Sequence, residues 1–523
     1  MSGASERILR IRSAIAIAAM LAAWEIVGRF ELIANGAFPA PTAILSGLWA
    51  DSDLYWRHIS ASVRSASLGF VIGNVIAVLM AVLFVQFPAT ERLMSGINIT
   101  LFAMPLIAVV PVLVLAFDGS TPQVVLAAVA VYYPTMSSML LGLRNVDDRL
   151  VDAIRGFGGG SLAILRRVRL RAALPALTIG LRTAAPAAVL GSLLAEFGSG
   201  SRWGLGTFLL GSLGAGDPAR LWGIGLVATG IAGVGYGVFA LVAKVTTRQV
   251  ASETLATSPV PASGSREEHP VTRFLYALAS LIVALGAWQL LLAVIDLNPI
   301  LTRSPAGVVR FLFTEDGSGE ARARLVTALG ETLPAVFWGL AAGLVAAFVF
   351  AVVLTLLPSV GRSVLPFALI SQTMPLVAFT PLIALVFGRG AWTTIVVTIS
   401  VTFFPSFVTI AQGLAMTPRR AVDVVQIYGG SKLTVLRLVS VPSAVPYLLA
   451  AARLAAPRAL LGVMVAEWLA TGRGLGNLLN ESRGRLDFGM IWSVAAVSVV
   501  VAIALYRVFV AIDQMVMKRY LGG

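Results

Sequence analysis

Charged residues interrupt the most apolar stretches of this chain, and several of them come in matched pairs. Arg182 and Arg453 are 271 positions apart (453 − 182 = 271), and the same displacement joins Glu196 to Glu467. A charge inside hydrocarbon is costly, so each of these residues is a candidate for a functional site. A guanidinium offers a planar fork of donors that suits oxyanions. The two arginines therefore predict a forked donor pair for an anion on a substrate pathway. The alternative is that each guanidinium only reaches the membrane surface.

Arg458 adds an asymmetry to this pattern. It shares an apolar stretch with Arg453, but Ala187 occupies the matching position in the first copy. Arg458 is therefore a third candidate for the substrate pathway, and one that only the second copy supplies.

Each of the two carboxylates comes just before a glycine-rich turn. We expect Glu196 and Glu467 to form an outer gate by pairing with Arg202 and Arg473, which follow within the same segments. The alternative is a pair of ordinary carboxylates at the membrane surface.

The matched charges belong to an internal repeat that covers most of the chain. Met104 begins the run MPLIAVVP and Met374 begins MPLVAFTP, a displacement of 270 (374 − 104 = 270). Phe157 begins FGGGSLAILRRV and Tyr428 begins YGGSKLTVLRLV. Two related bundles in one chain imply a pseudo-two-fold axis, along which transporters place their pathway.

The composition places both copies in a membrane. Hydrophobic residues make up 58% of the chain, charged residues make up 12%, and the mean hydropathy is +0.89. Six spans in each copy give both copies the same orientation, so we predict an all-α polytopic protein with about twelve transmembrane helices in two parallel six-helix repeats. The net charge of +14 then reflects inner loops rich in arginine rather than nucleic-acid binding. The expected spans are 12–29, 66–86, 99–117, 122–142, 174–195, 221–243, 273–295, 333–357, 364–386, 391–413, 444–467 and 490–512.

A polar segment separates the two copies. Residues 249–270 are dominated by Pro, Ser, Thr and Ala and have no apolar period, which predicts a flexible cytoplasmic linker. We therefore expect a first transmembrane domain at 1–248 and a second at 271–523.

The long inner connection between the fourth and fifth spans carries the strongest motif of each copy. Asp152 precedes Gly158 by six positions, and Asp423 precedes Gly429 by the same distance. This spacing predicts a short helix, a glycine turn at positive φ and a second short helix that continues into the next span. Such an element would project into the cytosol as a rigid knob. The alternative is a basic loop that only fixes topology.

At these residues the chain resembles the permease subunits of type I ABC importers, most closely the nitrate, sulfonate, taurine and bicarbonate branch. Their signature is Glu-Ala-Ala, three residues, Gly, nine residues and Ile-x-Leu-Pro. Asp replaces Glu in both copies, and Arg171 stands where the first copy should have proline. The resemblance implies coupling helices that dock in an ATPase, and it assigns this coupling to five residues: Asp152, Gly158, Asp423, Gly429 and Pro442.

The resemblance also implies partners and a location. The chain has no G-x-x-x-x-G-K-[ST] loop, so the ATP-binding-cassette ATPase would be a separate subunit in two copies, and the chain itself would not be an enzyme. A periplasmic or lipid-anchored binding protein would deliver substrate, and membrane lipid would surround the spans. We expect the bacterial cytoplasmic (inner) membrane, with both termini cytoplasmic.

The expected substrate is a small oxyanion such as a sulfonate, taurine, nitrate or bicarbonate. Two alternatives stay open: an ABC importer of a thiamine-precursor pyrimidine or other organic solute, and an ion-coupled secondary transporter with two six-helix halves. The chain has no cysteine and only two histidines, so we expect no cofactor and no metal site.

Overall fold

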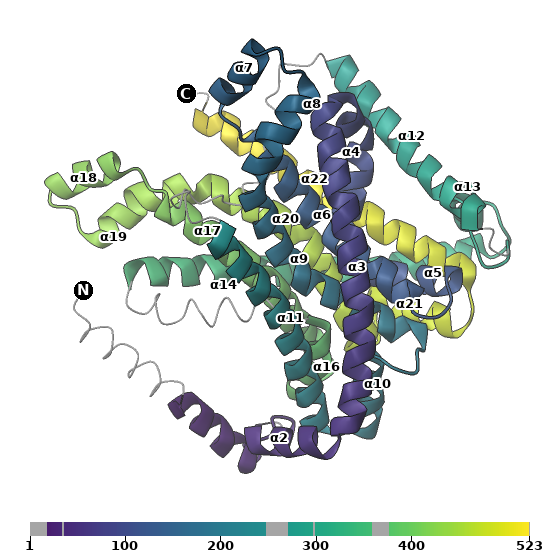
Figure 1. Ribbon diagram of the computed structural model, residues 1–523. Coiled ribbons are helices and arrows are strands. Elements are labelled where there is room, and N and C mark those ends of the chain that lie inside the picture. The colour runs from purple at the N-terminus through teal and green to yellow at the C-terminus, as the bar shows by residue number, and fades with distance from the viewer. Residues whose placement is uncertain (1–17, 34–35, 247–269, 296–298, 358–375, 522–523) are drawn as a thin grey trace.

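The structure is a computed structural model that describes residues 18–33, 36–246, 270–295, 299–357 and 376–521. Every regular element within these ranges is helical, which confirms the predicted all-α class (Figure 1). The predicted linker lies outside the described residues apart from Pro270, which begins the next helix.

Nine helices in the described ranges are long and apolar enough to cross a membrane. The first expected span begins outside these ranges, and the expected span 364–386 lies partly outside them. Two of the nine, α9 and α20, continue without a break from short helices before them. The nine are α3 (Ser52–Gln86), α6 (Thr121–Arg144), α9 (Leu170–Ser199), α11 (Pro218–Thr246), α12 (Pro270–Ile295), α14 (Ser318–Leu356), α17 (Ala391–Ala415), α20 (Val441–Ala466) and α22 (Phe488–Leu521).

One expected span is not a single straight helix. The segment predicted at 99–117 is divided between α4 (Pro88–Ala103) and α5 (Leu106–Ala116), whose axes differ by 101°. Pro105 has no N–H to donate and forces the residue before it out of helical geometry, and Met104 accordingly has φ −59° and ψ 122°. The bend directs α5 towards the second repeat, where it contacts α20, α21 (Gly474–Gly484) and α22.

Close helix contacts recur at matching positions in the two repeats. A Cβ added at Gly73 of α3 would lie 2.4 Å from the Ala128 carbonyl oxygen on α6. A Cβ added at Gly343 of α14, 270 positions later, would lie 2.1 Å from the Thr402 hydroxyl on α17. Only glycine permits backbones to approach this closely, so small residues set the helix spacing of each bundle.

The two repeats share one hydrophobic core. Ile107 and Val110 of the first repeat belong to the same buried cluster as Leu460 and Val463 of the second. The repeats also exchange contacts at the side, where α12 packs on α4 and the Gly96 N–H donates to the Ser280 hydroxyl at 2.5 Å.

Short helices lie at both ends of the bundle. The pair α7 (Asp148–Gly156) and α8 (Ser161–Ile164) lies at the top of Figure 1, and the pair α18 (Arg419–Ile427) and α19 (Lys432–Val435) lies at its left. The helices α2 (Pro41–Ala50) and α13 (Pro305–Phe313) follow the first span of each repeat. Two further short helices, α10 (Leu205–Ala215) and α21, follow the fifth span and were not predicted.

Candidate functional site

The predicted helix–glycine–helix element is present in the first repeat. It consists of α7 (Asp148–Gly156), Gly158 at φ +76° and α8 (Ser161–Ile164). The carboxylate of Asp147 caps α7 by accepting the Arg149 N–H at 2.9 Å. We call this element the first knob.

The second repeat contains the same element. It consists of α18 (Arg419–Ile427), Gly429 at φ +77° and α19 (Lys432–Val435), and we call it the second knob. A Cβ at either turn glycine would meet nothing within 4 Å, so glycine is needed for its backbone angle and not for space.

Each knob exposes an aromatic side chain immediately before its glycine. Phe157 is 92% exposed and Tyr428 is 88% exposed. Large exposed aromatic side chains are typical of protein interaction sites. The acidic positions Asp152 and Asp423 are also exposed, and Asp152 lies 3.5 Å from Arg155 on the same helix. The signature position Pro442 lies in the first turn of α20.

A π-helical turn joins each knob to the span that follows it. These turns are η2 (Leu165–Arg169) and η3 (Leu436–Ser440), at a displacement of 271. π-turns are rare and often lie at functional sites. Sequence analysis did not predict them, because a π-turn has no clear residue signature.

At the end of the bundle opposite the knobs, Glu196 is a buried acceptor. It is 2% exposed and accepts bonds from the Ser62 hydroxyl at 2.7 Å and from the Gly206 N–H, also at 2.7 Å. Ser62 in turn accepts the Leu205 N–H at 2.8 Å. The carboxylate therefore ties the fifth span to α3 and to the N-terminus of α10.

Glu467 does the same in the second repeat. It is 4% exposed and accepts the Thr332 hydroxyl at 2.8 Å and the Gly476 N–H at 2.9 Å. Thr332 accepts the Leu475 N–H at 2.9 Å. The pattern persists although the second repeat has one residue fewer between the carboxylate and the glycine. We call these two clusters the carboxylate latches.

The latches differ from the expected outer gate. Within the described residues neither carboxylate forms an ion pair with Arg202 or Arg473, because both carboxylates turn inward to backbone and hydroxyl donors. The guanidinium of Arg202 lies over the Trp203 ring instead, 5.2 Å from its centroid. Sequence analysis missed Ser62 and Thr332, although their displacement of 270 marks them as counterparts.

Arg182 and Arg453 each bind within their own repeat. The Arg182 guanidinium donates to the Tyr236 hydroxyl on α11 and lies 4.2 Å from the centroid of that ring. Arg453 forms an ion pair with Asp513 on α22 at 3.2 Å. Within the described residues no hydrogen bond or ion pair joins the two guanidiniums to a common partner, so the forked donor pair stays a prediction. Their Nε atoms are buried and have no hydrogen-bond partner.

Arg458 differs from these two arginines. It is partly buried on α20, and its guanidinium has no hydrogen bond or ion pair among the described residues. It lies nine positions before Glu467, about 13 Å along the helix. Because α20 contacts α5 of the first repeat, this span borders the junction of the two repeats.

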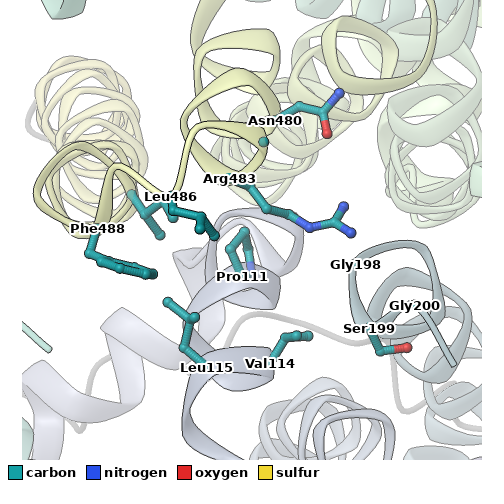
Figure 2. Close-up of a pocket in the computed structure, with 12 residues that line it drawn as sticks. Pro111, Val114, Leu115, Gly198, Ser199, Gly200, Asn480, Arg483, Leu486 and Phe488 are labelled. Atoms are coloured by element: carbon teal, nitrogen blue, oxygen red, sulfur yellow. The ribbon is translucent and has the colours of Figure 1, made fainter. Parts of the chain in front are cut away.

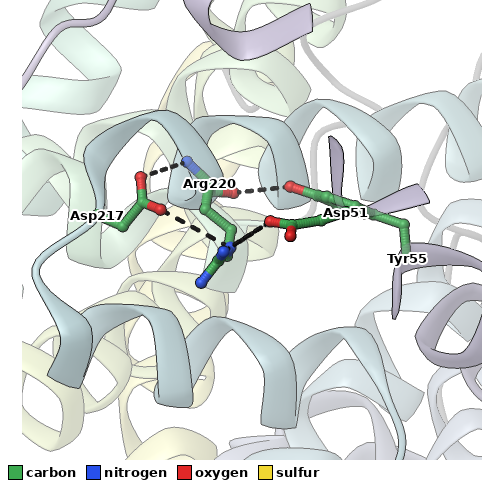
Figure 3. Close-up of polar contacts among 4 residues, drawn as sticks. All are labelled: Asp51, Tyr55, Asp217 and Arg220. Carbon is green, nitrogen blue, oxygen red and sulfur yellow. Dashed lines mark hydrogen bonds and ion pairs between the residues drawn. The ribbon is translucent and has the colours of Figure 1, made fainter. Parts of the chain in front are cut away.

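The end opposite the knobs is also fixed by ionic contacts. Arg220 at the start of α11 donates to Asp51 at 2.6 and 2.9 Å, and the Tyr55 hydroxyl donates to the Arg220 carbonyl at 3.2 Å (Figure 3). Asp217 caps the same helix by accepting the Arg220 N–H at 3.0 Å. In the second repeat Asp487 holds the matching cap and lies 3.7 Å from Arg324 on α14.

A pocket of about 510 Å³ lies between the two repeats at this same end. Its walls come from α5, from the end of α9 and from α21. Figure 2 shows the Arg483 side chain of α21 pointing into it, towards the segment that holds Gly198 and Ser199. Burial lowers the pKa of the Arg483 guanidinium, which nevertheless stays charged at neutral pH. The described residues hold no cluster of metal ligands here or elsewhere.

The family described as "Binding-protein-dependent transport system inner membrane component" matches residues 73–251 and again residues 339–521. The chain belongs to this family. Each match contains one knob and one carboxylate latch residue, so this permease holds two family domains in one polypeptide.

Each individual relative matches a stretch of the permease that is no longer than one repeat. A probable ABC transporter permease protein of Haemophilus influenzae is 28% identical over 205 residues, which are 39% of this chain and 83% of the relative. The formylaminopyrimidine transport permease protein of Halalkalibacterium halodurans is 34% identical over 159 residues, 30% of this chain and 64% of the relative. A putative aliphatic sulfonates transport permease protein of Bacillus subtilis is 26% identical over 197 residues, 37% of this chain and 71% of the relative.

These matches confirm the predicted family and its general role. The protein is a multi-pass permease component of ABC importers of the binding-protein-dependent type, which places it in the inner membrane. Membership implies an ATPase and a substrate-binding protein as partners. The ion-coupled secondary transporter is set aside by the same finding.

Proposed function

We propose that the permease imports a small oxyanion, driven by two copies of a separate ATPase, one beneath each knob. The observation that carries this proposal is the duplicated knob with an exposed aromatic residue, Phe157 or Tyr428, before a glycine at positive φ. A rigid projection with an apolar tip suits a groove on a partner protein. Asp152, Gly158, Asp423, Gly429 and Pro442 would carry this coupling, and the chain itself would hydrolyse no ATP.

The proposed movement begins at the knobs. Closure of the ATPase pair would push both knobs, and the turns η2 and η3 would pass the movement to the fifth span of each repeat. Each of these spans is continuous from its knob to its carboxylate latch. The two repeats would rock about their shared core as rigid bodies and open the pathway alternately to each side.

The same proposal fixes orientation. With the knobs in the cytosol, both termini and the linker are cytoplasmic and α2, α10, α13 and α21 face outward. The binding protein would dock on that outward side. The domains would be 1–248 and 271–523, joined by the linker 249–270.

Arg458 supports an anionic substrate. A partly buried guanidinium with no ion pair among the described residues favours an anion that arrives from outside the protein. Arg182 and Arg453 are less suited to this role. Arg182 already donates a hydrogen bond to Tyr236, and Arg453 already forms an ion pair with Asp513. Relatives of the permease are named for aliphatic sulfonates, taurine, formylaminopyrimidine and riboflavin, and the first two of these are oxyanions.

The test is ATPase activity in nanodiscs that contain the permease and the ATPase that co-purifies with it. Stimulation by a loaded binding protein should be lost in the double variant Gly158→Pro plus Gly429→Pro, since proline cannot adopt positive φ. Gly156→Ala and Gly160→Ala are matched controls, because their added Cβ atoms meet nothing within 4 Å. Absence of any co-purifying ATPase, or full stimulation in the folded double variant, would contradict the proposal.

A further inference from the structure

The pocket that contains Arg483 combines one cation with apolar walls. Val114 and Leu115 of α5 form one side, and Leu486 and Phe488, which follow α21, form another (Figure 2). Asn480 and Ser199 add an amide and a hydroxyl to the lining. A pocket of about 510 Å³ with apolar walls and a few polar groups is typical of a site for a small organic molecule.

The Arg483 guanidinium has no hydrogen bond or ion pair among the described residues, although the Arg483 carbonyl accepts the Leu486 N–H at 3.2 Å. Two other arginines at this end of the molecule have an acidic partner: Arg485 lies 2.8 Å from Glu481, and Arg324 lies 3.7 Å from the same carboxylate. The one carboxylate of α21 is therefore already neutralised by other arginines. Partly buried charges in proteins normally have a partner, so the chemistry of this pocket calls for an anion.

Only the second repeat supplies this cation. At a displacement of 270, Leu210 matches Asn480 and Leu213 matches Arg483. The caps Asp217 and Asp487 keep the same displacement, so the comparison is in register. Arg483 and Asn480 are thus features of the second repeat and not of the shared fold.

We propose that this pocket is an entry site for an organic anion with an apolar body, with the Arg483 guanidinium binding the anionic head and Val114, Leu115 and Phe488 packing on the body. The Asn480 amide adds a hydrogen-bonding group for the head. The site holds one molecule per chain. It rests on the proposed importer function, and it narrows the substrate class to anions such as alkanesulfonates, in preference to compact inorganic ions such as nitrate or bicarbonate.

The combination of charge and surface explains this preference. The guanidinium gives an oxyanion paired hydrogen bonds, while burial of each CH₂ of the body adds a favourable transfer free energy. Nitrate and bicarbonate have no apolar body and would leave the walls of the pocket unused.

The experiment measures binding to the purified full-length permease in nanodiscs by equilibrium dialysis. The probes are butane-1-sulfonate, sulfate and 1-butanol. Butane-1-sulfonate has both an anionic head and an apolar body, sulfate represents the head alone, and 1-butanol represents the body alone. Variants are Arg483→Gln, Arg483→Lys and Val114→Asn, with Arg485→Gln as the matched control two positions away. Uptake of the same probes is measured in proteoliposomes that contain the complete importer.

We expect butane-1-sulfonate to bind at least tenfold more tightly than sulfate or 1-butanol. Arg483→Gln should weaken its binding at least tenfold, Arg483→Lys should recover part of the loss, and Arg485→Gln should change it less than twofold. Equal binding of the three probes, or unchanged binding in Arg483→Gln, would overturn the assignment. If ATPase stimulation depends on the knobs but Arg483→Gln changes neither binding nor uptake of butane-1-sulfonate, this site is refuted and the importer function is not. Arg483-dependent binding without any ATPase partner would refute the importer and keep the site.

Discussion

The carboxylate of Glu196 accepts the backbone N–H of Gly206 at 2.7 Å across the loop that joins the fifth span to α10. Glu467 and Gly476 form the same bond at 2.9 Å. Glycine is required in these loops, because a Cβ at Gly474 would lie 2.0 Å from the Glu467 carboxylate oxygen. Each latch carboxylate thus binds the backbone of the helix that follows it. The Glu467 latch holds α21, which lines the Arg483 pocket.

Removal of a latch should destabilise the permease strongly. Glu467→Ala leaves the Gly476 N–H and the Thr332 hydroxyl without their buried acceptor, and we expect a loss of about 2 to 4 kcal/mol. Thermal unfolding of the purified chain, together with the rate of tryptic cleavage at Arg473, measures the effect. Glu320→Ala is the control, since Glu320 is exposed on α14. Equal unfolding midpoints for the two variants would show that the latch carries no structural weight.

The Arg453–Asp513 pair provides a test of structure against transport. Both side chains are less than one-fifth exposed, so Asp513→Ala should cost about 3 kcal/mol by leaving Arg453 unpaired. Arg453→Leu plus Asp513→Leu should recover much of that stability. A thermal double-mutant cycle gives the coupling, expected at about 1 to 3 kcal/mol. If the double variant is stable but transports nothing, Arg453 instead acts on the substrate.

The cost of a substitution at a knob glycine should depend on how well the new residue tolerates positive φ. Gly429→Asn should be mild, Gly429→Ala should cost about 1 kcal/mol locally, and Gly429→Pro should be severe, because the tolerance of positive φ falls in that order. Hydrogen exchange across residues 418–441 and stimulated ATPase activity report the two consequences. An order in which Asn is worse than Ala would indicate that the position responds to side-chain size and not to backbone angle.

Two glycines on α14 offer a matched comparison of packing. Gly343→Ala should destabilise the protein by about 1 to 3 kcal/mol, since its Cβ would meet the Thr402 hydroxyl at 2.1 Å. Gly330→Ala lies on the same helix, meets nothing within 4 Å, and should be neutral or slightly stabilising. Detergent thermal denaturation compares them directly. Similar midpoints would mean that α14 and α17 can separate freely.

Long apolar segments and repeat spacing carry clear signals, so the spans, the repeat and both knobs were predictable from the sequence. The prediction of a straight helix at 99–117 was wrong, because hydropathy does not show the bend that Pro105 imposes. The latch partners were missed since Ser62 and Thr332 are ordinary residues inside apolar helices. Arg483 was missed because α21 is too short and too polar to stand out as a span.

The hydrogen-bond and ion-pair partners of the arginines within the spans could not be predicted from the sequence. Sequence alone made Arg182, Arg453 and Arg458 equivalent candidates, because no pattern shows which carboxylate or phenol lies opposite each one. Asp513 and Tyr236 are 60 and 54 positions away from their arginines. Contacts over such distances depend on tertiary packing, which local periodicity does not encode.

The joining of two family domains in one chain has a genetic consequence. In a transporter made of two identical subunits, a new arginine would appear twice and face its own copy across the axis. Here Arg483 faces a repeat that keeps Leu213, and Arg458 faces one that keeps Ala187. One mutation therefore changes one repeat and leaves the other as it was, so the two repeats can specialise separately while a single gene keeps their ratio fixed.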